Sequence, residues 1–185
     1  IQLSVNSIKL LNEIGFGNFD KAQIYNPKKI NFIDAKSNKK ICDLNISKFN
    51  DENNQYTTLK RSTLLKFLLN NISKEKIKLN IQLKNLTYES KLTLSFNDNS
   101  IEEFDYLIVS DGVFSETKSV IEKKISKPIY YGATAIRSQI STQEISNINS
   151  NNISLIMGSN AHLVLYPVNK KKEINLVCII RKKLE

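Results

Sequence analysis

The chain opens with a short stretch in which apolar residues recur at helical spacing. Its apolar positions are Ile8, Leu10, Leu11 and Ile14. Asn6 stands before them as a capping residue, and Gly15 and Gly17 supply the stop. A second and clearer helical period predicts a helix over residues 59–72. Its apolar positions are Leu64, Leu65, Leu68, Leu69 and Ile72.

Alternating apolar and polar positions predict strands over most of the remaining chain. Residues 29–46 are predicted to form a hairpin with a polar turn at 36–39. Further strands are expected at 77–83, 92–96, 104–110, 129–140, 153–157, 162–168 and 174–180. A short helix is expected around 118–123, and residues 141–152 are expected to form a surface connection with one helical turn.

These elements predict two layers of different kinds. Residues 104–110 are almost continuously apolar, which is typical of a strand buried on both faces in an α/β layer. From residue 129 onward the chain is mostly β, which predicts an antiparallel sheet. The pattern therefore indicates a mixed α and β protein.

Length and composition narrow the class. With 185 residues, 41% of them hydrophobic and 24% charged, the chain can form one ordinary domain or parts of two smaller ones. No apolar run approaches the roughly 20 residues that span a membrane, so no transmembrane segment is expected. The chain begins at Ile1 and its single methionine is Met157, so we expect an internal piece of a longer protein.

The two cysteines, Cys42 and Cys178, form neither a CxxC motif nor a Cys/His ligand spacing. This predicts two reduced thiols in an intracellular protein and no metal site. The net charge of +9 raises nucleic acid as a partner. However, the lysines are scattered, and the densest cluster, Lys170-Lys171-Lys172, falls at an expected turn without interleaved aromatic residues. We expect no nucleic acid, and a basic, non-catalytic nucleic-acid-binding module remains the alternative from another class.

Two polar positions are candidates for holding a cofactor. Asp111 and Gly112 end the apolar run at 104–110, at the place where α/β folds bind cofactors beyond the carboxyl ends of strands. A plain strand-to-helix turn capped by aspartate is the alternative. Arg61 lies in the first turn of the predicted 59–72 helix and is suited to a bidentate grip on phosphate. An exposed helix arginine is the alternative there.

A third candidate lies on the strand at 162–168. His162, the single histidine, and Tyr166 share one face of that strand and are expected about 7 Å apart. Such a pair suits a pocket for a phenol, in which one group hydrogen-bonds or deprotonates the hydroxyl and the other orients it. An edge-strand histidine beside a packed tyrosine is the alternative. Arg137, on another strand, could pair with an anionic substrate or face solvent.

Five segments resemble, in order, motifs of the FAD-dependent aromatic-ring monooxygenases of the salicylate hydroxylase type. Residues 1–15 resemble IQLxxNAxxxLxxLG, and 56–65 resemble hRxxLhxxL. Residues 104–115 resemble ADLLVGADGxxS, 131–137 resemble YTGYxAWR, and 162–175 resemble HxVxYPVxxGxLxNxV. The resemblance covers essentially the whole chain with compatible spacings, which is more specific than any one motif.

The resemblance implies the p-hydroxybenzoate hydroxylase fold. The fold class expected is α/β (α+β), with a partial FAD-binding Rossmann-like domain and a mixed or antiparallel β-sheet substrate domain. Residues 1–21 and 57–124 would belong to the FAD-binding domain. Residues 22–56 would be a hairpin contributing to the substrate domain, and residues 125–185 would form its truncated sheet.

The resemblance also implies a reaction and residue roles. NAD(P)H would reduce FAD, O2 would add to the reduced flavin, and the hydroperoxide would hydroxylate a phenolic or aromatic-acid substrate, in the cytoplasm. Arg61 would contact the phosphate region of FAD, and Asp111 with Gly112 would lie along the cofactor. His162 and Tyr166 would line the aromatic pocket, on the sheet that Arg137 joins. A ubiquinone-pathway ring hydroxylase or an epoxidase of the same fold is the alternative.

The sequence departs from the family pattern at several positions. Ser110 replaces an alanine, Lys118 stands where an arginine is common, and Ile136 replaces a tryptophan. The chain also has neither the GxGxxG motif for the ADP half of FAD nor the family's Gly-Asp motif. The chain by itself is therefore expected to bind FAD weakly.

Overall fold

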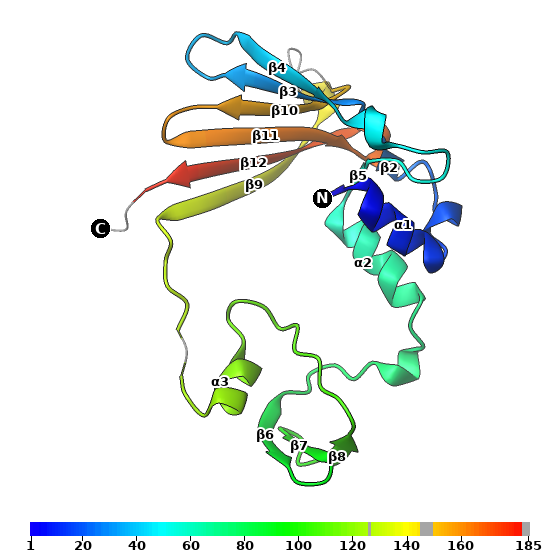
Figure 1. Ribbon diagram of the computed structural model, residues 1–185, viewed down its shortest axis with the longest axis vertical. Coiled ribbons are helices and arrows are strands. Elements are labelled where there is room, and N and C mark those ends of the chain that lie inside the picture. Colours follow the sequence, from blue (N-terminus) through cyan, green and yellow to red (C-terminus); the bar gives the residue numbers. More distant parts are fainter. Residues whose placement is uncertain (126, 145–149, 183–185) are drawn as a thin grey trace. The chain divides into compact units, whose positions relative to one another are not determined.

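The computed structural model describes residues 1–125, 127–144 and 150–182. The chain divides into two compact units (Figure 1). The first unit combines Ile1–Ile72 with Gly132–Glu185, and the second is Ser73–Tyr131. Each unit has its own strands and helices and is described by itself.

The first unit is built on a six-stranded sheet with the order β4-β3-β10-β11-β12-β9. Its strands are β3 (Lys29–Asp34), β4 (Lys40–Asn45), β9 (Ala133–Ser141), β10 (Ile153–Met157), β11 (Ala161–Val168) and β12 (Glu173–Arg181). β3 and β10 pair in parallel, and the other neighbours are antiparallel. This confirms the predicted mixed sheet and the hairpin, although β9 begins later than residue 129 and Ile46 lies in the 3-10 turn η2 (Ile46–Phe49).

Polar turns connect these strands where the sequence predicted them. After β3, the Asp34 carboxylate accepts hydrogen bonds from the Ser37 backbone N–H at 2.7 Å and the Ser37 hydroxyl at 2.5 Å. Between β11 and β12, the 3-10 turn η5 (Asn169–Lys171) has positive φ at all three residues. The lysine cluster is therefore a turn. Between β9 and β10, η4 (Thr142–Glu144) supplies the single helical turn expected there, and residues 145–149 of that connection lie outside the described residues.

One face of the six-stranded sheet carries a hydrophobic core. Its buried members are Ile46, Ile153, Tyr166, Val168 and Val177. Val168 and Ile153 are almost wholly removed from solvent. Burying a side chain of this size stabilises a fold by about 1.5–3 kcal/mol, so this face anchors η2 and the segment around Tyr56 to the sheet.

The first unit also contains a small antiparallel sheet with the order β1-β5-β2. Its strands are β1 (Gln2–Leu3), β2 (Ile24–Tyr25) and β5 (Thr57–Leu59). The helices α1 (Val5–Glu13) and α2 (Arg61–Asn70), with the 3-10 turn η1 (Phe16–Asn18), pack against it (Figure 1). Ile8, Phe16 and Leu59 are buried at this second core, and the rings of Phe16 and Phe67 meet edge to face at 5.2 Å.

Strand β5 joins the small sheet to the large one, because its side chains alternate between two sides. Leu59 faces the helices, in the core with Ile8 and Phe16. Thr58 faces the other way, and its buried hydroxyl donates a hydrogen bond of 2.5 Å to the Pro167 carbonyl of β11. Tyr56, on the same side as Thr58, packs against the core of the six-stranded sheet.

Both predicted helices form, with corrections at their starts. The N-cap of α1 is Ser4, so the prediction that Asn6 caps this helix is wrong. Asn6 lies inside the first turn, and Gly15, at φ +91°, follows the end of the helix as predicted. Helix α2 begins at Arg61 and not at residue 59, because Leu59 is fully buried in β5.

The predicted apolar face of α2 is wrong in part. Leu64 and Phe67 pack into the core of the small sheet, whereas Leu65 and Leu69 are exposed. The helix itself is confirmed, but its buried side is rotated toward Phe67, which is not among the predicted apolar positions. The three-phenylalanine cluster of Phe16, Phe19 and Phe67 explains this rotation, because an edge-to-face ring cluster draws the helix onto Phe67.

The second unit is an antiparallel three-stranded sheet with one helix. It contains β6 (Leu83–Tyr88), β7 (Leu92–Phe96), β8 (Ile101–Phe104), α3 (Glu116–Glu122) and the 3-10 turn η3 (Lys74–Lys76). The strand at 92–96 and the short helix are confirmed. The strand predicted at 77–83 is wrong, because β6 begins at Leu83 after Asn80, which has φ +59° and turns the chain.

The buried strand predicted at 104–110 is also wrong. Only Phe104 belongs to a strand, at the end of β8, and residues 105–110 are irregular. Tyr106 and Ile108 are each 88% exposed. A strand forms by pairing, and no strand among the described residues pairs with this segment, so its apolar side chains find no sheet to enter.

The described residues include no helix long and apolar enough to cross a membrane. Cys42, on β4, and Cys178, on β12, are both free cysteines. Three strands of the six-stranded sheet lie between their strands.

Candidate functional site

The structure brings Arg137, His162 and Tyr166 to one face of the six-stranded sheet. Residues paired across neighbouring strands point to the same face. Val177 of β12 pairs with Arg137 on one side and with Val164 on the other. Val164 lies between His162 and Tyr166 with period two on β11, so all three candidate side chains share its face.

The spacing of His162 and Tyr166 differs from the expectation. Four residues of strand span about 13 Å, so the expected separation of about 7 Å is wrong. Val164 occupies the position between them, half-buried on the same face. One hydroxyl group cannot contact both side chains at once, and the two residues instead border the two ends of an area large enough for an aromatic ring.

Tyr166 is the most enclosed of the three, with 4% of its surface exposed. Burial raises the pKa of its phenol above the ordinary value of 10, the Arg137 guanidinium works against this shift, and Tyr56 adds to it. The phenol therefore remains protonated at neutral pH and can donate a hydrogen bond. The strand pairings place Arg137 on the face of Tyr166, and Tyr56 packs against the core to which Tyr166 belongs.

Tyr56 and Gln2 complete the polar surroundings of Tyr166 and were not predicted as site residues. Gln2 pairs with Thr58 across β1 and β5, so it points to the same side of the small sheet as Tyr56. The Tyr56 hydroxyl donates to Gln2 Oε1 at 2.7 Å, and burial raises the pKa of Tyr56. Tyr56 immediately precedes β5, and its place at this face depends on the pairing of β5 with β1 and β2, which no local pattern of the sequence shows.

Asn175 is a further polar residue of this face that the site prediction left out. It pairs directly with Tyr166 across β11 and β12. Its Nδ2 atom is buried and has no hydrogen-bond partner among the described residues. A buried donor without a partner costs about 1–3 kcal/mol, so this row of the sheet is polar where packing alone would favour an apolar side chain.

Asp111 and Gly112 lie in the second unit, in the irregular loop before α3. The Asp111 carboxylate accepts hydrogen bonds from the Ser115 hydroxyl and from the Thr117 backbone N–H at 3.3 Å, and the Ser115 bond is the largest cause that lowers its pKa. Gly112 has φ +84° with open space where a Cβ would stand. The aspartate therefore orders the start of α3, and the glycine leaves its backbone approachable.

Arg61 is exposed at the first position of α2, in the first unit. The preceding residue, Lys60, is already engaged, because its ammonium pairs with the Glu173 carboxylate of β12 at 2.5 Å. The basic group that α2 offers to a ligand at this end is therefore Arg61. The described residues contain no group of three or more His, Cys, Asp or Glu side chains that could hold a metal ion.

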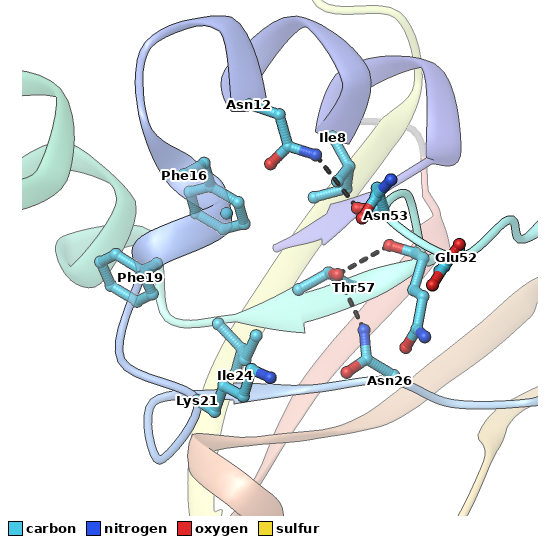
Figure 2. Close-up of a pocket in the computed structure, with 12 residues that line it drawn as sticks. Ile8, Asn12, Phe16, Phe19, Lys21, Ile24, Asn26, Glu52, Asn53 and Thr57 are labelled. Atoms are coloured by element: carbon cyan, nitrogen blue, oxygen red, sulfur yellow. Dashed lines mark hydrogen bonds between the residues drawn. The ribbon is translucent and has the colours of Figure 1, made fainter.

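A cavity that the sequence did not predict lies in the first unit, beside the small sheet (Figure 2). Its volume is about 490 Å³. Apolar side chains of Ile8, Phe16, Phe19 and Ile24 meet polar side chains of Asn12, Asn26 and Thr57 there. These residues come from α1, η1, β2, β5 and the segments beside them, so no single sequence motif marks the cavity.

Solved structures are similar to this chain in fold, whereas family models and curated sequences give no match. No protein-family model matches the chain, and no curated protein does. A salicylate hydroxylase in a substrate complex is similar with a TM-score of 0.80 and 16% identity, over 100% of this chain and 49% of that chain. HpxO of Klebsiella pneumoniae, complexed with FAD and uric acid, is similar with a TM-score of 0.81 and 15% identity, over 100% of this chain and 48% of that chain.

The 2,6-dihydroxypyridine-3-hydroxylase of Arthrobacter nicotinovorans gives a TM-score of 0.79 and 16% identity, over 98% of this chain and 46% of that chain. The chain has the fold of these hydroxylases. The predicted fold class, α/β (α+β) with a mixed sheet, is thus confirmed. The chain spans about half the length of each of these hydroxylase structures.

Proposed function

We propose that this chain is part of a flavin-dependent monooxygenase that uses NAD(P)H and O2 to hydroxylate a small phenolic or aromatic-acid substrate. The observation that carries the proposal is the gathering of Arg137, His162 and Tyr166 on one face of the sheet in the hydroxylase fold. Salicylate hydroxylase and HpxO with FAD and uric acid, among the similar structures, support an aromatic substrate.

In this proposal the sheet face binds and orients the substrate. The Arg137 guanidinium pairs with an anionic group of the substrate, a role for which its permanent charge and planar fork are suited. Tyr166, kept protonated by burial, donates a hydrogen bond to a substrate oxygen. His162, about 13 Å along β11, acts at the other end of the ring, where its imidazole accepts or orients the proton of a hydroxyl.

Arg61, Asp111 and Gly112 are the residues that we propose for holding FAD. Arg61 offers an exposed cation for a phosphate, the ionised Asp111 accepts hydrogen bonds from sugar hydroxyls, and Gly112 allows close approach of its backbone. When bound, FAD supplies the redox chemistry that takes electrons from NAD(P)H and activates O2.

The domain assignment follows the same proposal. Residues 1–21 and 57–124 belong to the FAD-binding domain, and residues 22–56 and 125–185 to the substrate domain. The hairpin β3–β4 supports this division, because it joins the sheet that carries Arg137 and Tyr166. Two free cysteines on well-separated strands are compatible with the cytoplasm as the proposed location.

Substitutions on β11 of the intact protein test the proposed function. In His162→Ala and Tyr166→Phe, we expect bound flavin to be retained and hydroxylation to fall by about 10²–10⁴-fold, the range for loss of a positioned proton-transfer group. Product formation from salicylate with NAD(P)H, measured by chromatography, reports the change.

Leu163→Met is the matched control for these variants. Leu163 lies on the same strand but points to the opposite face, and the replacement conserves its volume. We expect its turnover to equal that of the unsubstituted protein. Full turnover in both His162→Ala and Tyr166→Phe would contradict the assignment of the substrate face.

A further inference from the structure

The cavity shown in Figure 2 is a second candidate binding site, separate from the sheet face that carries Tyr166. Strand β5 lies between the two, because Thr57 lines the cavity and Tyr56 packs on the opposite side of the strand. Its volume of about 490 Å³ lies within the range of sites for small molecules.

The hydrogen bonds of Asn12 fix the orientation of its amide. Nδ2 donates to the Asn53 carbonyl and to Asn54 Oδ1, both at 3.0 Å. Both amide hydrogens are therefore engaged by acceptors, and the opposite orientation would place two acceptors against each other. Oδ1 of Asn12 is left facing the Phe16 side of the cavity (Figure 2).

Asn26, on the other side of the cavity, has the same arrangement. Its Nδ2 donates to the Tyr56 carbonyl at 3.1 Å and to Thr57 Oγ1 at 2.9 Å. The Thr57 hydroxyl donates its hydrogen to the Gln55 carbonyl at 2.8 Å, so toward Asn26 it can act only as an acceptor. Oδ1 of Asn26 is left as a second acceptor, and among the described residues no donor bonds to either of these two oxygens.

The apolar wall between these acceptors is suited to a flat ring. Phe16 and Phe19 stack at 5.1 Å with nearly parallel planes, and Ile8 and Ile24 extend the wall. An aromatic ligand can offset-stack or meet these rings edge to face. Lys21 and Glu52 both line the cavity, so its charged groups are one of each sign.

We propose that this cavity binds a small planar molecule that carries N–H donors on an aromatic ring, of the aromatic amine or amidine class. The unused carbonyl oxygens of the half-buried Asn12 and Asn26 can accept donors from a ligand, and the phenylalanine wall is suited to an apolar body. At these two oxygens an aromatic carboxylate would bring acceptors to acceptors, so the amine or amidine is the class that fits them. This site is independent of the proposed hydroxylation.

Gly17 provides a way to block the cavity without removing any of these hydrogen bonds. It lies within the 3-10 turn η1 and lines the cavity. A Cβ added there would stand 3.6 Å from Asn12 Oδ1, which is an ordinary van der Waals distance. A leucine at this position would therefore extend beside the acceptor. Asn18, the next residue of η1, is exposed and does not line the cavity.

Binding of benzamidine to the intact protein, followed by NMR through the side-chain amide signals of Asn12 and Asn26, tests the proposal. We expect saturable shifts of both signals in the unsubstituted protein and in Asn18→Leu, and affinity at least about tenfold weaker in Gly17→Leu. Benzoate, which has the same ring without donors, should leave both signals unmoved. Absence of benzamidine binding, equal binding of benzoate, or unchanged affinity in Gly17→Leu would overturn the proposal.

Discussion

Tyr166 combines burial, a cation and a second phenol in one environment. Burial is the main cause that raises its pKa, Arg137 lowers it, and Tyr56 raises it again. Because burial outweighs the cation, the side chain reaches the substrate face as a neutral donor. The pKa of Tyr56 is raised by burial alone, and its hydroxyl donates a hydrogen bond to Gln2. Both phenols are thus neutral over the whole physiological range.

These shifts predict the alkaline behaviour of the protein. Tyr56 and Tyr166 should ionise above pH 10, the ordinary value of their pKa. Above pH 10 the unfolded chain releases these protons more readily than the folded one, so the free energy of unfolding should fall as pH rises. Tyrosinate absorbance against pH, compared between the unsubstituted protein and Tyr166→Phe, measures this. The difference between the two titrations is the ionisation of Tyr166. A midpoint at or below pH 10 for that difference would contradict the account.

For single residues, the sequence predicted that His162 and Tyr166 share a face of one strand. It did not predict which side chains of other segments surround Tyr166. His162 and Tyr166 followed from the period of two along one strand, which is a local property. Gln2 lies on β1, Asn175 lies on β12, and Tyr56 lies immediately before β5. Their approach to Tyr166 depends on the register of long-range pairs such as Tyr166 with Asn175, and composition carries no information on register.

Leu59 was predicted as the start of a helix but belongs to the short strand β5. Leu59 fits the apolar period of the following helix, and the sequence extended the helix to include it. Only three residues form the strand, and they owe their extended conformation to pairing with β1 and β2 on both sides. A strand this short has too few alternating positions to be recognised before its partners are known.

Removing the Thr58 hydroxyl tests whether β5 anchors the small sheet to β11. In Thr58→Val the Pro167 carbonyl loses its buried donor, while the shape of the side chain is nearly kept. We expect a loss of about 1–3 kcal/mol in the free energy of unfolding, measured by denaturant titration. The control is Thr63→Val on α2, whose hydroxyl has no hydrogen bond among those found in the described residues. Equal stability of the two variants would show that the bond to Pro167 contributes nothing.

The segment at 104–110 marks the limit of prediction at the level of elements. Its apolar run is typical of a buried strand, yet the described chain leaves it irregular and exposed. Hydrophobicity indicates that a segment is suited to burial, and partners decide whether it becomes a strand. Asp111 and Gly112 nevertheless lie shortly before α3, where the Asp111 carboxylate accepts from the Thr117 backbone N–H, while the N-cap of the helix is Ser115.

For the whole molecule, the order of motifs predicted the fold better than any single element did. The chain matches hydroxylase structures at TM-scores of 0.79 to 0.81 with 15–16% identity, while no family model matches it. The parallel pairing of β3 with β10 joins segments more than a hundred residues apart. Such a contact cannot be read from periodicity. The resemblance implied only that the hairpin at 22–56 contributes to the substrate domain, and the parallel pairing itself was not predicted.

The visible absorption of the purified intact protein tests the central claim most directly. The account predicts bound flavin, seen as the two absorption bands of the oxidised isoalloxazine, which bleach when NAD(P)H is added without O2. It also predicts that Arg61→Ala lowers flavin occupancy, because it removes the cation proposed for the phosphates. A colourless intact protein that gains no flavin absorption when refolded with FAD would contradict the account.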